Sequence, residues 1–221
     1  MLKIEKTVLP SPEQWEIIIE GMRNPMNSWD KMDSGVQEVI CEDDDLPEYP
    51  EYEFVLGEND HRLMSGLAKG GAVHAKYRRM IPVFLTIDAP LYWWKEFDTY
   101  KVGTVANSCS TMHKIHAKEF ITNDFSHDHT QVPGWLEYTI QILNSCRDKF
   151  LTTKDKQWWY SMIQILPTSY NQKRTVMLNY EVLVNIYHSR KNHKLDEWHV
   201  FCDWIEQLPY SELITGENAN G

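Results

Sequence analysis

The feature of this sequence that most limits its fold is a succession of helix-forming patterns interrupted by two clear strand patterns. Residues 81–87 (Ile-Pro-Val-Phe-Leu-Thr-Ile) favour a strand, and residues 174–178 favour a second, shorter one. Apolar residues at helical spacing predict helices at 11–22, 60–69, 90–100, 135–150, 155–165, 179–190 and 196–208. The sequence therefore predicts a helix-rich α+β fold.

We expect residues 1–221 to form a single domain, because the chain can bury a full core and shows no linker between domains. Residues 1–24 are expected to contain an N-terminal helix, with Ser11 as the cap, Pro12 at the first position and Gln14 completing a capping box. Residues 25–59 are expected to form an acidic, loop-rich segment, and residues 60–215 the core.

The formal net charge of −10 is unevenly distributed along the chain. Residues 42–60 hold nine acidic side chains and no basic one, and the rest of the chain is close to neutral. Nonspecific nucleic-acid binding depends on Lys and Arg to replace counterions, so we expect no nucleic-acid partner. The acidic segment fits a solvated surface, but shielding of a subunit interface or binding of a basic partner stays open.

The N-terminal sequence MLKIEKTVLP lacks the apolar core of a signal peptide, and no run approaches 18 apolar residues. The four cysteines, Cys41, Cys109, Cys146 and Cys202, lie far apart and form no CxxC pair. We therefore expect a soluble cytoplasmic protein with free thiols and no membrane contact.

Two clusters offer alternative chemistries. His113, His116, His127 and His129 lie close in sequence, and imidazole suits zinc, iron or manganese. A histidine-metal hydrolase is therefore an alternative, although exposed loop histidines are the simpler interpretation and we expect no metal site. Cys109, near His113, could form an activated thiolate, but no nucleophile signature surrounds it and a small residue in a polar loop explains it as well.

The predicted helix 179–190 offers a possible binding face. Asn179 and Arg190 are about 1100° of helical rotation apart, which places them on one face near Leu183 and Ile186. An amide and a guanidinium on one face could contact a planar polar ligand. The alternative is a core helix with an ordinary Asn cap and an Arg that complements the helix dipole.

A resemblance to a known family rests on this region. The matching residues are Leu166, Pro167, Tyr170, Thr175, Asn179, Leu183 and Arg190. They resemble the C-terminal segment of the flavin-dependent thymidylate synthases, with the family's Leu-Pro, Tyr-Thr, Asn, Leu and Arg in order. The resemblance extends over roughly residues 60–210, and His74 is similar in position to a histidine that precedes the family's signature.

Residues 92–114 combine an aromatic start with a polar run, which suits neither a core helix nor a linker. Residues 107–113 resemble the family's Asn-Glu-x-Ser-x-Arg-Tyr signature, in which Asn107 and Ser110 match. Ser108, Met112 and His113 stand in place of Glu, Arg and Tyr. The family's preceding Arg-His-Arg is absent, and Lys95-Glu96-Phe97 stands near its place.

The resemblance implies a single helix-rich domain with a central, mainly antiparallel sheet that assembles as a homotetramer. It implies FAD as cofactor, with methylenetetrahydrofolate and NADPH as co-substrates and a small-molecule nucleotide as ligand. The implied cofactor-binding residues are Asn179, His74 and Lys95. The implied substrate-binding residues are Asn107, Ser108, Ser110 and Arg190, of which Arg190 is also the expected catalytic residue.

The function implied is transfer of a one-carbon unit from methylenetetrahydrofolate to C5 of a deoxyuridylate-like nucleotide, with reduction by a flavin hydride. The lost arginines make a second interpretation necessary, because a guanidinium binds phosphate through strong charge-assisted bonds. That second interpretation is a nucleotide- or flavin-binding homologue without catalysis, which serves a regulatory or interaction role.

Overall fold

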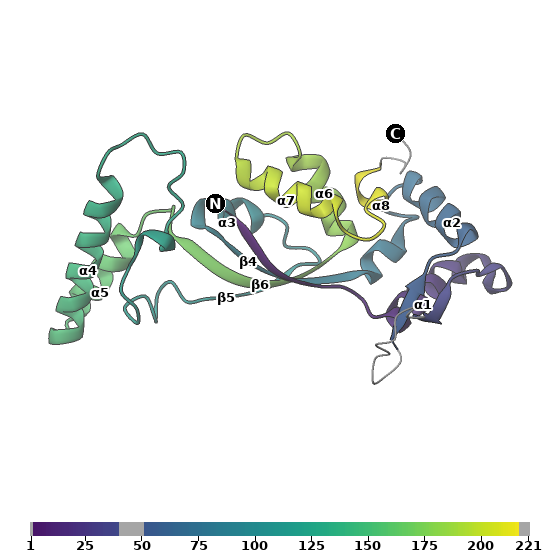
Figure 1. The fold of residues 1–221 in the computed structure, drawn as a ribbon, viewed down its shortest axis with the longest axis horizontal. Helices are drawn as coiled ribbons and strands as arrows, with labels where there is room; N and C mark the ends of the chain where they lie inside the picture. Colours follow the sequence, from purple (N-terminus) through teal and green to yellow (C-terminus); the bar gives the residue numbers. More distant parts are fainter. Residues whose placement is uncertain (1, 40–50, 217–221) are drawn as a thin grey trace, which may run out of the picture. The chain divides into compact units, whose positions relative to one another are not determined.

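The computed structural model describes residues 2–39 and 51–216 (Figure 1). These residues divide into two compact units, each made of several chain segments. We call residues 2–6, 85–101 and 105–176 the hairpin unit, and residues 7–39, 51–84, 102–104 and 177–216 the pocket unit. The expectation of one domain over residues 1–221 stays a prediction.

The fold is of the mixed helix-and-sheet class with a mainly antiparallel sheet, which confirms the predicted class. Four strands follow the order β1 (Lys3–Val8), β4 (Pro82–Pro90), β6 (Asn171–Asn179) and β5 (Val105–Ser108). Two backbone bonds show that β4 and β6 are antiparallel: Tyr180 N donates to Ile81 O at 3.2 Å, and Leu91 N donates to Tyr170 O at 3.0 Å. Both predicted strands therefore exist and are longer than predicted.

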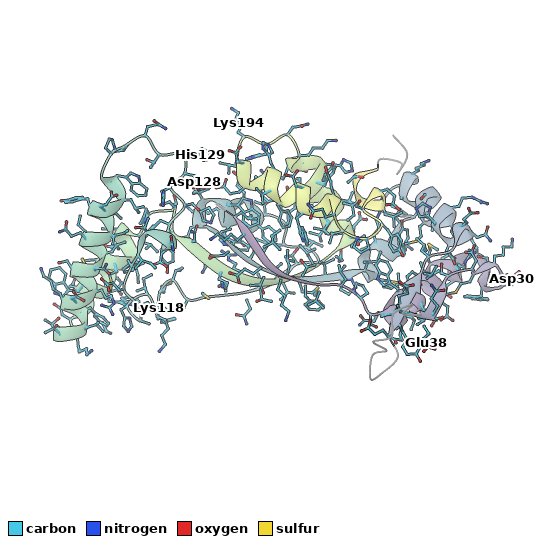
Figure 2. The ribbon with its side chains drawn as sticks, in the orientation of Figure 1. Asp30, Glu38, Lys118, Asp128, His129 and Lys194 are labelled. Atoms are coloured by element: carbon cyan, nitrogen blue, oxygen red, sulfur yellow. The ribbon has the colours of Figure 1, made fainter. Side chains whose placement is uncertain are left out.

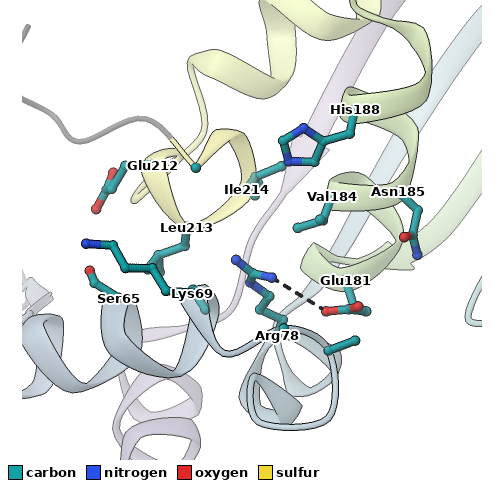
Figure 3. A pocket seen from close by; sticks show the side chains of 14 residues that line it. Ser65, Lys69, Arg78, Glu181, Val184, Asn185, His188, Glu212, Leu213 and Ile214 are labelled. Atoms are coloured by element: carbon teal, nitrogen blue, oxygen red, sulfur yellow. Dashed lines mark ion pairs between the residues drawn. The ribbon is translucent and has the colours of Figure 1, made fainter.

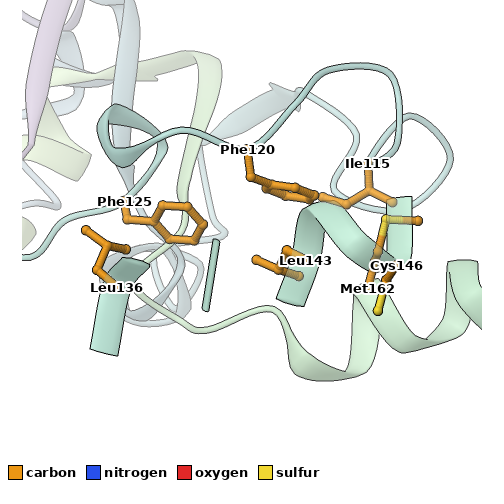
Figure 4. Packing of buried hydrophobic residues seen from close by; sticks show 7 residues of the cluster. All are labelled: Ile115, Phe120, Phe125, Leu136, Leu143, Cys146 and Met162. Carbon is orange, nitrogen blue, oxygen red and sulfur yellow. The ribbon is translucent and has the colours of Figure 1, made fainter. Parts of the chain in front are cut away.

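In the hairpin unit, α4 (Trp135–Thr153) and α5 (Lys156–Ile165) pack against each other as a helical hairpin (Figure 1). Their buried contacts continue into the segment before α4, which includes η4 (Thr122–Asp124). The cluster consists of Ile115, Phe120, Phe125, Leu136, Leu143, Cys146 and Met162 (Figure 4). The short helix α3 (Leu91–Phe97) follows β4 and buries its aromatic residues separately.

The pocket unit contains most of the helices. They are α1 (Pro12–Arg23), η1 (Asn24–Met26), η2 (Trp29–Lys31), α2 (Glu58–Lys69), η3 (Lys76–Met80), α6 (Tyr180–Arg190), α7 (Asp196–Glu206) and α8 (Glu212–Thr215). A two-stranded antiparallel sheet joins β2 (Gly35–Glu38) to β3 (Tyr52–Val55) and packs on α1. Among the described residues of both units, no helix is both long and apolar enough to cross a membrane.

The first helix forms as predicted. Ser11 Oγ accepts from Gln14 N at 3.3 Å, and Gln14 Oε1 accepts from Ser11 N at 2.9 Å, which completes the capping box. The predicted apolar stripe of α1 is buried, with Ile19 wholly inaccessible to solvent.

The N-terminal third contains elements besides those predicted. Residues 1–24 contain strand β1 before the helix, and residues 25–59 contain η1, η2, β2 and β3 in addition to loops. The pattern Lys-Ile-Glu-Lys-Thr-Val of β1 is largely exposed, so backbone pairing rather than an apolar face forms this strand. Charged side chains such as Asp30 and Glu38 lie at the surface (Figure 2). The acidic residues 42–48 lie outside the described part.

Candidate functional site

A pocket of about 340 Å³ lies within the pocket unit, between α2, η3, α6 and α8. This volume is at the lower end of small-molecule sites, and it suits one nucleotide-sized group. We call it the α6 pocket. Its lining residues are Ser65, Ala68, Lys69, Gly71, Ala72, Arg78, Glu181, Val184, Asn185, His188, Glu212, Leu213, Ile214 and Gly216 (Figure 3).

One face of α6 forms a wall of this pocket. Glu181, Asn185 and His188 repeat at spacings of four and three residues, so they share a face. Leu183 and Ile186, on the opposite side, are fully buried in the core. The polar face of α6 thus lines the pocket, and Asn185 and His188 on it are also exposed to solvent.

Arg78 and Glu181 lie side by side in the lining of the pocket and form an ion pair (Figure 3). Arg78 Nη1 lies 3.9 Å from Glu181 Oε2, which is an ion pair but too long for a hydrogen bond. The side chain of Arg78 is 7% exposed and that of Glu181 is 14% exposed. Neither Arg78 Nε nor Glu181 Oε2 has a hydrogen-bond partner among the described residues. Each side chain of this ion pair therefore has one buried polar atom whose hydrogen-bonding capacity is unused among the described residues.

Arg78 is held in place by the short helix η3. The neighbouring Tyr77 is buried and donates its hydroxyl to Met64 O at 2.9 Å, which fastens η3 to α2. Burial raises the pKa of Tyr77 to about 12, so the hydroxyl stays protonated and keeps donating at neutral pH.

The remaining polar groups of the pocket come from α2 and α8. Ser65 and Lys69 lie one turn apart on α2, and Glu212 begins α8. His61 Nε2 lies 2.7 Å from Glu212 Oε1, so the two helices are joined beside the pocket. The pocket therefore carries cationic groups on two of its elements and carboxylates on two others.

Three predicted site residues belong to the pocket unit. Asn179 Oδ1 accepts from Val182 N at 3.1 Å, as an ordinary helix cap. Arg190 stacks on Trp198, with 4.8 Å from the guanidinium carbon to the ring centre. Asn179 and Arg190 lie about 16 Å apart along the axis, and they share the face opposite to the pocket wall. His74 is exposed in the turn before η3, close in sequence to the pocket residues Gly71 and Ala72.

The other predicted site residues belong to the hairpin unit. Lys95 is exposed on α3, and Asn107 and Ser108 are exposed on β5. Ser110 Oγ accepts from His113 N at 2.9 Å and from Met112 N at 3.3 Å, so it forms a local turn. The structure thus brings Asn107, Ser108 and Ser110 together on one surface segment. Their roles in binding, like those of the pocket-unit residues, stay predictions.

The described residues give little support to the two alternatives, a histidine-metal site and an activated Cys109 thiolate. Among the described residues, no three His, Cys, Asp or Glu side chains form a group that could hold a metal. The ring of His116 packs on Phe150 with 4.8 Å between ring centres. Cys109 is an exposed free thiol, and burial raises the pKa of the Cys202 thiol to about 12. Cys41 lies outside the described residues.

Sequence reasoning missed Arg78 and Glu181. They belong to η3 and α6, far apart in the chain, and neither stands in a recognisable motif. One signal was present: the polar stripe Glu181, Asn185 and His188 on a helix whose other side is apolar. A polar face of this kind normally faces solvent, and Asn185 and His188 are exposed here, so the stripe alone does not locate the cavity.

Comparisons with known proteins agree on the fold alone. No protein-family model matches the chain, and no curated protein matches it. A crystal structure of thymidylate synthase X from Helicobacter pylori with FAD and dUMP matches with a TM-score of 0.67 and 12% identity. This match covers 98% of the chain and 96% of the other protein. A second complex of the Helicobacter pylori flavin-dependent enzyme with FAD and dUMP has a TM-score of 0.64, 12% identity and coverages of 98% and 97%.

Proposed function

We propose that this chain is a divergent FAD-dependent enzyme that methylates a pyrimidine nucleotide at C5. The observation that carries the proposal is the fold likeness, because both similar crystal structures of the Helicobacter pylori enzyme hold FAD and dUMP and each match covers 98% of this chain.

In the proposed reaction, a one-carbon unit passes from methylenetetrahydrofolate to a deoxyuridylate-like substrate, and FAD, reduced by NADPH, supplies the hydride. The chain's own residues bind and orient these molecules. Arg190 donates to a pyrimidine carbonyl, and Asn179, His74 and Lys95 contact the flavin. Asn107, Ser108 and Ser110 hydrogen-bond the nucleotide in a cytoplasmic homotetramer.

A second candidate is a nucleotide- or flavin-binding protein without catalysis. It is favoured by residues 107–113, where the family's signature has Glu, Arg and Tyr but this chain has Ser108, Met112 and His113. Met112 cannot replace the charge-assisted bonds of an arginine to phosphate. Binding of FAD and dUMP without turnover would identify this candidate.

Uptake of FAD tests the proposal first. We expect the purified full-length chain to be yellow or to bind added FAD, with a visible flavin absorbance band and quenched flavin fluorescence. Titration of the protein into FAD, followed by fluorescence, measures the affinity. A protein that stays colourless and leaves FAD fluorescence unchanged at high concentration would exclude the flavin enzyme and a flavin-binding homologue, and would leave only a nucleotide-binding homologue.

Replacing Arg190 with alanine is expected to lower turnover by about 100-fold or more, because a donor aimed at developing charge contributes that much in enzymes. Steady-state methyl transfer measures it, and size-exclusion chromatography with light scattering checks that the oligomer is intact. Arg190→Lys keeps the charge and the stacking partner Trp198, so it separates catalysis from stability. Undiminished turnover in Arg190→Ala would show that Arg190 is not the catalytic residue.

A further inference from the structure

The four-stranded sheet has two edge strands, and they differ in how they are protected. β1 and β5 stand at the two ends of the strand order (Figure 1). An edge strand has backbone N–H and C=O groups without a neighbouring strand, and proteins usually guard such an edge with charged side chains or proline. β1 is guarded in this way by Lys3, Glu5 and Lys6. β5 has the sequence Val-Ala-Asn-Ser, so its edge carries no such guard.

β5 is also uncovered on both of its faces. All four of its residues are exposed, and Val105 is 62% exposed. Cys109, directly after the strand, is an exposed free thiol, and the uncharged sequence continues to Met112. The chain as a whole has a net charge of −10, so two copies repel each other over most of their surfaces. An uncharged, exposed strand edge is a place where two copies can meet without this repulsion.

The hydrogen bonds at the end of β5 show which of its backbone groups point outward. Cys109 N donates to Lys173 O at 2.9 Å, and Cys109 O accepts from Gln172 Nε2 at 2.7 Å, so the backbone of Cys109 faces β6. Successive residues of a strand turn their N–H and C=O groups to opposite sides. The backbone groups of Ala106 and Ser108 therefore point to the open side of β5.

We propose that β5 pairs with β5 of a second copy of this chain, in antiparallel orientation about a two-fold axis at Asn107. Ala106 then lies opposite Ser108 of the partner subunit, and these two residues exchange both of their backbone hydrogen bonds on each side of the axis. Val105 lies opposite Cys109 of the partner subunit, so two exposed, uncharged side chains cover each other.

The partner is a second copy because this edge is complementary to itself. In the two-fold arrangement each outward N–H meets an outward C=O of the same strand in the other copy, and no charged side chain of β5 opposes the contact. The proposal goes beyond the proposed function, since it names the surface through which two copies meet and holds whether or not the chain binds a flavin.

An introduced cysteine tests both the contact and its register. Opposite residues of a non-hydrogen-bonded antiparallel pair have Cα atoms about 4.5 Å apart, which is within the range of a disulfide. We expect Val105→Cys to form a disulfide with Cys109 of the partner subunit when diamide is added, because diamide takes up the two electrons and two protons that the thiols lose. Non-reducing gel electrophoresis is expected to show most of the chain as a covalent dimer.

Two controls fix the register of the pair. Among the described residues of the wild type, Cys109 is the exposed thiol, and the two copies of Cys109 would lie about 13 Å apart, too far for a disulfide. In the double variant Val105→Cys, Cys109→Ser the introduced thiols are equally far apart. Neither control is expected to form the dimer. Equal cross-linking in the controls, or none in Val105→Cys, overturns the inference.

Proline at position 106 tests the backbone hydrogen bonds. Ala106→Pro removes the outward N–H and leaves the N–H groups that face β6 in place. Ala106→Val is the matched control, because it changes the same exposed side chain but keeps the N–H. Sedimentation velocity is expected to show association of the wild type and of Ala106→Val, and at least tenfold weaker association of Ala106→Pro. Circular dichroism confirms that both variants are folded.

The outcomes separate the inference from the proposed function. A wild type that stays monomeric at high micromolar concentration, or an Ala106→Pro variant that associates as strongly as the wild type, overturns pairing through β5 whether or not FAD binds. Register-specific cross-linking in a chain that leaves FAD fluorescence unchanged supports the pairing and excludes the flavin enzyme.

Discussion

Replacing Asp60 with alanine is expected to lower the free energy of unfolding by about 3–5 kcal/mol, because it leaves a buried arginine without its counter-charge. Asp60 is fully buried at the start of α2, and its Oδ1 accepts from Arg23 Nε. Its Oδ2 accepts from Asp33 N and Ser34 N, both at 2.9 Å, and from Ser34 Oγ at 2.7 Å. One carboxylate thus joins α1, the segment before β2 and α2.

Urea denaturation monitored by circular dichroism measures this loss. Asp60→Asn is a second useful variant, since it keeps the shape and part of the hydrogen bonding but removes the charge. Its free energy of unfolding should lie between those of the wild type and Asp60→Ala. Asp30→Ala is the control, because Asp30 is an exposed acid of η2 and its loss should change stability by under about 0.5 kcal/mol. A loss below about 1 kcal/mol in Asp60→Ala would show that Arg23 finds other partners.

The parts of the fold that can be predicted from sequence are those with local causes. The capping box at Ser11 and the Asn179 cap make hydrogen bonds to residues three positions away, so a short stretch of sequence contains the whole interaction. Apolar periodicity likewise located α4, α5 and α7 within a few residues of their ends. Strands β1 and β5 escaped prediction because their side chains are largely exposed and only pairing with distant strands forms them.

The candidate site was less predictable because its parts meet only in the folded chain. Arg78 stands in a short helical turn and Glu181 follows a helix cap, and neither position signals binding by itself. Pattern analysis drew attention to Asn179 and Arg190 because they share a helix face, yet the cavity lies beside the other face of α6. Helical spacing shows which residues share a face, but tertiary packing decides which face meets a cavity.

The aromatic start of residues 92–114 illustrates the same limit. Trp93 and Trp94 stand next to a polar run, a combination that suits neither a core helix nor a linker, but both are fully buried on α3. Their rings meet edge to face with 4.9 Å between centres, and Phe97 completes the group. These residues form a core, and the exposed polar segment that follows is a separate feature.

Replacing Trp94 with alanine is expected to lower the free energy of unfolding by about 3–5 kcal/mol, the usual range for a fully buried large aromatic. Trp94 Nε1 donates to Gln172 O at 2.8 Å, and the Arg174 guanidinium carbon lies 4.2 Å from its ring centre. Arg174 Nη1 also donates to Asp98 at 2.7 Å. The indole thus supports both β6 and the cation above it, so its loss removes packing, a hydrogen bond and a cation–π contact together.

Trp94→Phe separates these contributions, because it keeps most of the apolar ring but removes the N–H. It should lower the free energy of unfolding by roughly half as much as Trp94→Ala does, or less. Tyr160→Ala, at a half-exposed position of α5, is the control for loss of an aromatic side chain near the surface.

Gln172 Nε2 also donates to Cys109 O at 2.7 Å, so a shift of β6 in Trp94→Ala should reach the segment after β5. Amide hydrogen exchange should therefore rise at Cys109, whose N donates to Lys173 O. Unchanged exchange there, together with lost stability, would show that the Trp94 core and the exposed polar segment are energetically independent.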